Sequence, residues 1–164
     1  MFENNNMTKI LTILTIPNPI LRKKSEDISL KKLAEKKLQV LALNMAKTMK
    51  EKDGIGLAAP QVGDNIRLIT VNTKEGVLIL INPKITKKSF AKEWAEEGCL
   101  SVPGVYGKVK RSKKINCIYL DTSGEKKKIS AEGLLARVIQ HEIDHLDGIL
   151  FIDKAKEINK VNLE

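Results

Sequence analysis

The sequence contains few cysteines and few aromatic residues, and it has no long hydrophobic run. Two cysteines in 164 residues are too few for a disulfide framework, so we expect a reduced, cytoplasmic setting. Aromatic residues make up 4% of the chain, so aliphatic residues must fill the core and platforms for stacking on bases are scarce. The longest apolar run near the start, Ile10 to Ile16, stops at Pro17 and is too short to cross a bilayer, which argues against a membrane partner.

The length and composition predict a single globular domain over residues 1–164. Hydrophobic residues form 42% of the chain and charged residues 30%, which is typical of folded proteins. We expect residues 1–8 to be a flexible extension, because Met7 offers a second start, and residues 154–164 to be a variable tail. The net charge of +9 leaves two interpretations open: a solvated basic surface, or attraction to a polyanion such as RNA or a ribosome, without recognition of a specific nucleic-acid sequence.

Apolar periodicity predicts two long helices with strands between them. The first runs from Leu30 to Lys52 behind a Ser29 cap, and the second, largely buried, runs from about Ala131 to His145. A short third helix is expected at 153–160. Strands are expected at 67–72, 77–81, 85–94, 115–120 and 126–130, the last two joined by a turn at DTSGE.

These elements predict an α+β fold. We expect mainly antiparallel strands packed around the central buried helix, which carries the pattern HExxH, together with an N-terminal helix. His141 and His145 are the only histidines, and four helical residues turn the chain by roughly 400°, so both project from one face. Two imidazoles can hold a divalent ion, and Glu142 can reach a water on it. The alternative is a buried histidine pair hydrogen-bonded within the core.

A catalytic metal site of this kind needs a third protein ligand. One known extension places a third histidine three residues after a glycine at Gly148, but Phe151 occupies that position. A carboxylate, Cys99 and Cys117 stay open as candidates. Cys117 lies in KINCIYL, where strand alternation predicts burial as a small apolar residue, whereas Cys99 follows a glycine in EEGCLSVPG, where the backbone is irregular.

The stretch GIGLAAPQ, at 54–61, lies in a glycine-punctuated loop that we expect at 53–64. It completes neither a dinucleotide fingerprint nor a P-loop, and by itself it indicates an ordinary turn. Its glycines permit close approach of a ligand to the backbone, and Gln61 offers an amide donor for a developing oxyanion.

Taken together, three stretches resemble the motifs of peptide deformylase: GIGLAAPQ at 54–61, EGCLS at 97–101 and QHEIDHLDG at 140–148. They occur in the family's order, and the resemblance extends from about Lys9 to Asp153. It implies removal of the N-formyl group from the N-terminal formyl-methionine of nascent polypeptides, with release of formate. The implied mechanism is attack on the formyl carbon by metal-bound hydroxide, with Glu142 as general base and acid.

The resemblance also implies a role for individual residues. Cys99, His141 and His145 would be the metal ligands, and Gln61 with the backbone N–H of Leu100 would hold the oxyanion. A supporting ion pair between Glu97 and Arg111 is a further hypothesis. Substrate would contact Ile55, Gly56, Gly98, Leu134, Val138 and His141.

Family resemblance further implies one divalent ion, natively Fe²⁺, while thiolate and imidazole ligands also suit Zn²⁺, Ni²⁺ and Co²⁺. Expected partners are N-formylmethionyl peptides and, transiently, the ribosome, with the protein acting as a monomer. Arg137 departs from the family pattern, in which apolar residues are common, so the pocket rim is expected to differ. The tail from Asp153 to Glu164 is short for the ribosome-docking helix that the family resemblance implies.

Three rival functions remain open from the sequence. The first is an HExxH metalloprotease that cuts internal peptide bonds, and the second is a basic binding protein with structural histidines. The third is an inactive relative, although every catalytic position is intact. Metal content and formate release distinguish these alternatives.

Overall fold

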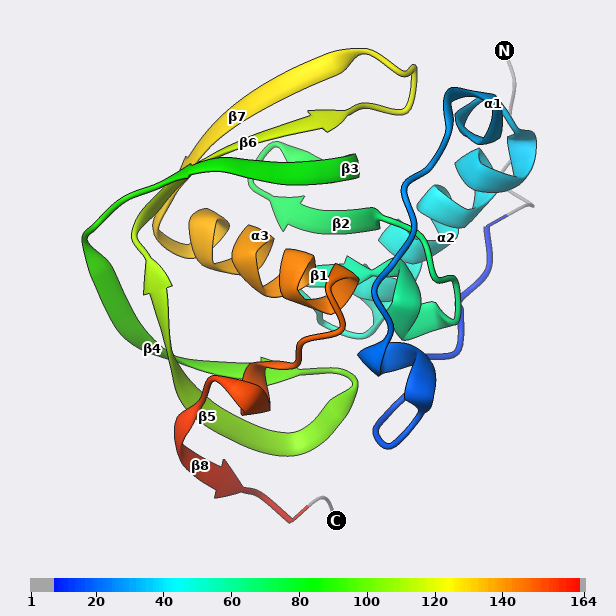
Figure 1. Ribbon diagram of the computed structural model, residues 1–164. Coiled ribbons are helices and arrows are strands. Elements are labelled where there is room, and N and C mark those ends of the chain that lie inside the picture. The colour runs from blue at the N-terminus through cyan, green and yellow to red at the C-terminus, as the bar shows by residue number, and fades with distance from the viewer. Residues whose placement is uncertain (1–7, 163–164) are drawn as a thin grey trace.

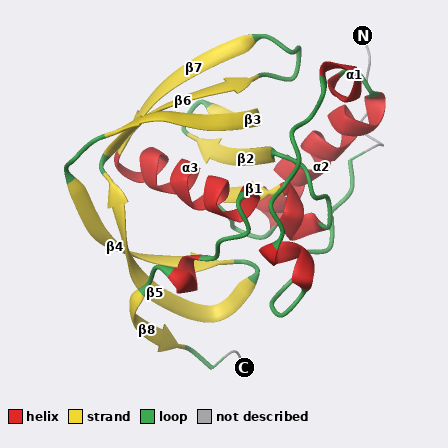
Figure 2. Ribbon diagram, viewed as in Figure 1, coloured by secondary structure: helices red, strands yellow, loops and turns green. Residues whose placement is uncertain are grey.

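The computed structural model describes residues 8–162 and wraps two sheets around one buried helix (Figures 1 and 2). The helices are α1 (Leu30–Leu33), α2 (Lys36–Glu51) and α3 (Gly133–Leu146), with 3₁₀ turns at Pro19–Arg22, Ala59–Val62 and Phe151–Asp153. The strands are β1 (Gly56–Ala58), β2 (Leu68–Thr73), β3 (Gly76–Lys88), β4 (Lys92–Cys99), β5 (Val102–Ser112), β6 (Lys114–Leu120), β7 (Lys126–Glu132) and β8 (Lys156–Lys160).

The strands form a five-stranded sheet in the order β1-β2-β3-β6-β7 and a three-stranded sheet in the order β4-β5-β8. Every pairing within the two sheets is antiparallel. Figure 1 shows α3 between the sheets, and α3 contacts β1, β2, β6 and β7 of the larger one and β5 of the smaller one. The predicted α+β class, with antiparallel strands around a central helix that carries HExxH, is confirmed.

The apolar face of α3 is buried against the larger sheet. Ala136, Ile139 and Leu146 on this face are each 0% exposed and pack with Val71 and Leu80 of the sheet. This packing leaves the remaining faces of α3 for polar residues that meet β1 and the smaller sheet. The helix is therefore fixed in rotation by its apolar residues, and its histidines point where the two sheets converge.

The predicted helix from Leu30 to Lys52 is wrong in one respect, because it is broken into α1 and α2. Ser29 caps α1 as expected, its Oγ accepting a hydrogen bond from Lys32 N at 3.3 Å, but Glu35 is extended. In an unbroken helix Leu33 and Leu38, five residues apart, would point roughly 140° away from each other. The break lets both side chains enter the same core beneath α2.

The predicted strand at 85–94 is two strands that belong to different sheets. The chain leaves the larger sheet after Lys88 and joins the smaller sheet at Lys92. The corner between them is held by Ser89 N, which donates to Lys114 O at 2.9 Å. Strand β5, the partner of β4, was not predicted, because Gly104 and Gly107 interrupt its apolar alternation.

The predicted helix at 153–160 is wrong, because Lys156–Lys160 forms strand β8 against β5. The segment has little apolar periodicity with which to bury a helix, whereas β5 presents a free edge whose N–H and C=O groups require partners. The expected loop at 53–64 contains the short strand β1 and a 3₁₀ turn. The strand predicted at 77–81 is the first part of β3, which continues to Lys88 through the predicted break. The remaining predicted strands and the second helix lie within a few residues of the observed elements.

The predicted flexible extension lies outside the described residues except for Thr8, whose carbonyl accepts a hydrogen bond from Lys47 Nζ at 3.2 Å. No helix within residues 8–162 is long and apolar enough to cross a membrane.

Replacing Ile139 with alanine should reduce the free energy of unfolding by about 2–5 kcal/mol, because it opens a cavity between α3 and the larger sheet. Leu43 provides a control, because it is 52% exposed on α2. The substitution Leu43→Ala should change the free energy of unfolding by less than about 0.5 kcal/mol. Urea unfolding of the two variants measures the difference. Equal losses would show that the core is not organised around α3.

Candidate metal centre and active site

The structure brings Cys99, His141 and His145 together at the junction of β4 and α3. Their candidate ligand atoms all lie within 4.8 Å of one another, and Cys99 Sγ lies 3.2 Å from His145 Nε2. A register shift between Gly98 and Cys99 ends the regular pairing of β4 with β5. Such irregularities re-aim a side chain, which here brings the thiol to the helix. The group can hold one metal ion and leave a position for water.

Cys117 is excluded from this site. Its side chain is 0% exposed within β6 and packs in the core of the larger sheet, as the strand alternation predicted. Burial raises the pKa of the Cys117 thiol to about 11, so it stays protonated and unreactive.

Glu97 fixes the orientation of the His141 ring. Nδ1 of His141 donates to Glu97 Oε2 at 2.9 Å, which leaves Nε2 for a metal ion. Burial opposes a charge on His141, but its hydrogen-bond partners Cys99 and Glu97 raise its pKa to about 10. A proton and a metal ion therefore compete for the same Nε2 atom.

Two arginines hold the Glu97 carboxylate in place. Arg111 donates to it through Nε and Nη2, both at 2.9 Å, and Arg137 Nη1 donates to Oε1 at 2.7 Å. Burial by itself favours the neutral acid, but hydrogen bonds from Arg111 and His141 keep the pKa of Glu97 well below its usual range. The hypothesised pair of Glu97 and Arg111 is present, and Arg111 also contacts Asp144, which Lys154 binds at 2.8 Å.

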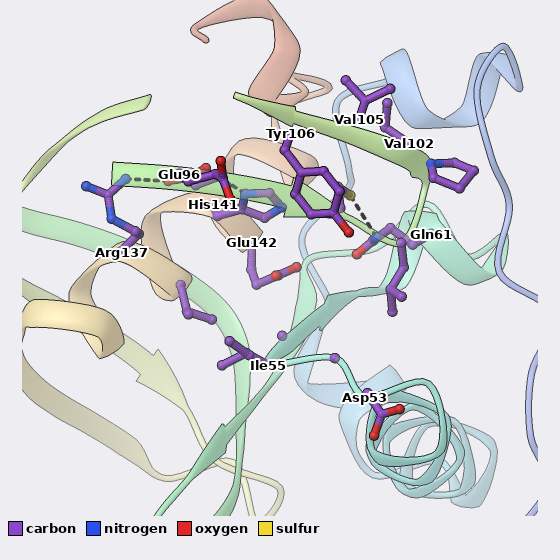
Figure 3. A pocket seen from close by; sticks show the side chains of 18 of the residues that line it. Asp53, Ile55, Gln61, Glu96, Val102, Val105, Tyr106, Arg137, His141 and Glu142 are labelled. Carbon is purple, nitrogen blue, oxygen red and sulfur yellow. Dashed lines mark hydrogen bonds and ion pairs between the residues drawn. The ribbon is translucent and has the colours of Figure 1, made fainter. Parts of the chain in front are cut away.

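Arg137 extends this network and does not project into open solvent. Its side chain is only 11% exposed, and its guanidinium also donates to Val109 O at 2.9 Å and to Glu93 O at 2.8 Å. Figure 3 shows this guanidinium directed away from the centre of the pocket, with a dashed line to the carboxylate. The departure from the family pattern at this position therefore adds a second cation behind the site.

Glu142 lies beside the three candidate ligands with its carboxylate buried. The residue is 4% exposed, and Oε2 has no hydrogen-bond partner among the described residues. Burial raises the pKa of Glu142 to about 7, so the group can accept and return a proton near neutral pH. A Cβ on Gly56 would lie 2.3 Å from Oε1, so only glycine allows β1 this close to the carboxylate.

His145 is also suited to a metal ion. It is 1% exposed, and burial lowers the pKa of His145 well below its usual value, so the imidazole is neutral and has a lone pair to donate. The buried Nδ1 of His145 and Oε2 of Glu142 both lack partners within the described chain. Because Nε2 is the ring nitrogen of His145 that faces Cys99 Sγ, the atom that bears on a metal is Oε2 of Glu142. An unpartnered carboxylate oxygen beside a thiol and two imidazoles fits a metal ion with a bound water better than it fits a satisfied core.

Gln61 faces the candidate metal centre from the turn after β1. Its Oε1 accepts from Ala58 N at 2.9 Å, so Nε2 is the end directed toward Ser101 Oγ, at 3.1 Å, and Cys99 Sγ, at 3.5 Å. Leu100 follows Cys99 in the same turn and lines the same pocket. Both predicted oxyanion donors are therefore adjacent to the thiol.

A pocket of about 500 Å³ opens over these residues (Figure 3). Two edge strands border it, because β1 lies at one end of the larger sheet and β4 at one end of the smaller sheet. The ring of Tyr106 lies over Gly98, where a Cβ would come within 2.7 Å of it. All the predicted substrate residues line the pocket: Ile55, Gly56, Gly98, Leu134, Val138 and His141.

Three supporting residues were given no role by the sequence reasoning. Ser101 binds Gln61, and Asp144 with Lys154 supports Arg111. Ser101 and Asp144 lie inside the recognised motifs, and this position was the one signal that could have indicated a role for them. Their hydrogen-bond partners are distant in sequence, so the role itself could not be predicted.

The fold and the site define a metal-dependent hydrolase in which one buried helix supplies two histidines and an acid, and a strand supplies a thiol. The polypeptide deformylase model matches residues 10–161, and the chain belongs to that family, whose members remove the N-formyl group from nascent polypeptides.

Relatives and solved structures agree with this assignment. The chain is 49% identical over 148 residues to the peptide deformylase of Syntrophomonas wolfei, covering 90% of this chain and 95% of that one. It is 47% identical over 153 residues to that of Halothermothrix orenii, covering 92% and 97%. The crystal structure of the Thermotoga maritima enzyme is 39% identical with a TM-score of 0.86, covering 90% of this chain and 99% of that one. An actinonin complex from Synechococcus elongatus is 38% identical, with a TM-score of 0.85 and coverage of 96% and 87%.

Replacing Glu97 with glutamine should weaken metal binding by about 10–100-fold, because the hydrogen-bonded anion that orients His141 is lost. The matched control is Glu96→Gln, since Glu96 is the neighbouring exposed carboxylate at the same pocket, whereas the hydrogen bond to His141 Nδ1 comes from Glu97. Competition with a chelator measures the affinity of both variants. Unchanged affinity in Glu97→Gln, with the fold intact, would contradict the orienting role.

Proposed function

We propose that this protein hydrolyses the formyl group from N-formylmethionyl peptides, with Cys99, His141 and His145 holding one divalent metal ion. The observation that carries the proposal is the convergence of these three ligand atoms within 4.8 Å beside the buried carboxylate of Glu142. Membership of the deformylase family supports the choice of substrate over internal peptide bonds.

The proposed native ion is Fe²⁺. One thiolate and two imidazoles suit iron, and they also accept Zn²⁺, Ni²⁺ or Co²⁺. When bound, such an ion polarises the formyl oxygen and lowers the pKa of a coordinated water.

The substrate is proposed to lie as an extended strand between the two sheets. Strands β1 and β4 each offer an unpaired edge at the pocket, through Gly56 and Gly98 respectively, and a peptide can pair with both. Its methionine side chain then enters the apolar part of the pocket, which is lined by Ile55, Leu134, Val138 and the ring of His141.

Two donors are proposed to stabilise the oxyanion. Gln61 Nε2 already faces the site, because Ala58 N holds the opposite end of the amide. The backbone N–H of Leu100 is the second donor, next to Cys99 in the chain. One donor of this kind typically contributes about 3 kcal/mol to transition-state stabilisation.

Glu142 is proposed to move the proton. It takes a proton from the attacking water and returns it to the amine as the bond to the formyl carbon breaks. A pKa near 7, raised by burial, suits both steps. The products are formate and a free N-terminal methionine.

The protein is proposed to act as a cytoplasmic monomer with only transient ribosome contact. A peptide that pairs with β1 and β4 completes the cleft without a second copy of the chain. The net charge of +9 favours approach to a polyanionic particle. The described part of the tail pairs with β5 as β8 and does not form a projecting helix.

The direct test is formate release from formyl-Met-Ala-Ser by the iron-loaded protein. Glu142→Gln should retain the metal yet lower kcat by about 10²–10⁴-fold, because the proton acceptor is lost. Metal analysis of the same samples is the control. A folded, iron-loaded wild type that releases no formate, or that cuts casein instead, would overturn the proposal.

The two cysteines provide a matched test of the ligand set. Cys99→Ala should lose stoichiometric metal, because a thiolate ligand is removed, whereas Cys117→Ala should retain it, because that thiol lies in the core. Elemental analysis after dialysis against a weak chelator measures both. Full metal content in Cys99→Ala would refute the proposed ligand.

A further inference from the structure

A second concavity lies on the other side of α3 from the active-site pocket. This basic groove, of about 920 Å³, is formed by α3, the end of β3, the start of β4 and the end of β5. Gln140 and Asp144 of α3 line the groove, whereas Val138 and Glu142 of the same helix line the active-site pocket. A ligand in the groove would therefore leave the entrance to the active site open.

The charges that line the groove are unbalanced. Its acidic residues are already paired, Asp147 with Arg67 at 2.8 Å and Asp144 with Lys154 at 2.8 Å, while Asp27 lies 3.8 Å from Arg67. Five lysines that also line it are exposed and have no acidic partner among residues 8–162: Lys24, Lys84, Lys88, Lys92 and Lys110. They come from the N-terminal arm and three different strands, so the fold gathers them along one groove.

An aromatic residue lies between two of these lysines in the chain. Phe90, between Lys88 and Lys92 at the corner where β3 passes into β4, is 102% exposed. The corner is well ordered, because Ser89 N donates to Lys114 O at 2.9 Å and Ser89 Oγ donates to Ala91 O at 2.8 Å. Full exposure of a phenyl ring costs hydration free energy, and a ring held on a hydrogen-bonded corner is available for a base to stack on.

We infer that the basic groove and Phe90 bind single-stranded RNA, with the lysines along its phosphates and a base on the phenyl ring. Lysines that follow a channel combined with an exposed aromatic ring are the features by which proteins hold single strands without reading sequence. An anionic membrane fits less well, because lysines inside a concave groove cannot all reach a flat surface. This inference is independent of the proposed deformylation, since neither the five lysines nor Phe90 line the active-site pocket.

The test measures binding of fluorescent oligouridine RNA to the full-length, metal-loaded protein by anisotropy at several salt concentrations. Five lysine–phosphate contacts predict a slope of log K against log salt of about −3.5. Combined Lys84→Glu, Lys88→Glu and Lys92→Glu should weaken binding about tenfold or more and reduce that slope by about 2. Phe90→Ala should weaken binding about fivefold or more with little change in slope.

The matched control reverses three exposed lysines on α1 and α2, at the opposite side of the molecule in Figure 1: Lys31, Lys36 and Lys37. This variant has the same net charge as the groove variant and should bind RNA nearly as well as the wild type. Equal weakening by both sets, absence of RNA binding, or preferential binding to phosphatidylserine vesicles would each overturn the inference. Formate release should be the same in both charge variants, so failure of deformylation and failure of RNA binding are read separately.

Discussion

The rest of the site depends on the hydrogen bonds that the buried carboxylate of Glu97 accepts. This carboxylate joins β4 to Arg111 of β5 and to Arg137 and His141 of α3. A buried ion of this kind is costly unless every lone pair is satisfied, so its partners are confined to one arrangement. That arrangement adds to the apolar packing that sets the rotation of α3, and it determines the direction of His141 Nε2.

The candidate active site lies where each of the two sheets has an unpaired edge strand, β1 in one and β4 in the other. If β1 and β4 each had another strand beside it, the pocket would have no unpaired backbone to offer a peptide. Instead α3 fills the space between the sheets with apolar residues on one side and leaves its acid and histidines near both edges. The proposed substrate strand and the candidate metal ligands therefore share one pocket, and α3 separates that pocket from the basic groove.

Sequence periodicity predicted those helices and strands whose own residues have a regular apolar spacing. The helix carrying HExxH and the strand around Cys117 have regular apolar spacing, and both were found within a few residues. The break at Glu35, the corner at Ser89 and the strand Lys156–Lys160 were not predicted. Each of these features depends on contacts with residues far away in the chain, and local residue propensities do not reflect such contacts.

The sequence by itself determined the chemistry: two histidines and an acid on one helical face, a cysteine after a glycine, and an amide in a glycine-rich turn. The ordered motifs were sufficient to indicate the family. Only the tertiary structure decided that Arg137 turns inward to Glu97, that Ser101 holds Gln61, and that lysines from separate strands share one groove, with Phe90 exposed where β3 passes into β4. The physical reason is that charge, burial and hydrogen bonding act through space, so a residue's role is set by neighbours that the order of the chain does not reveal.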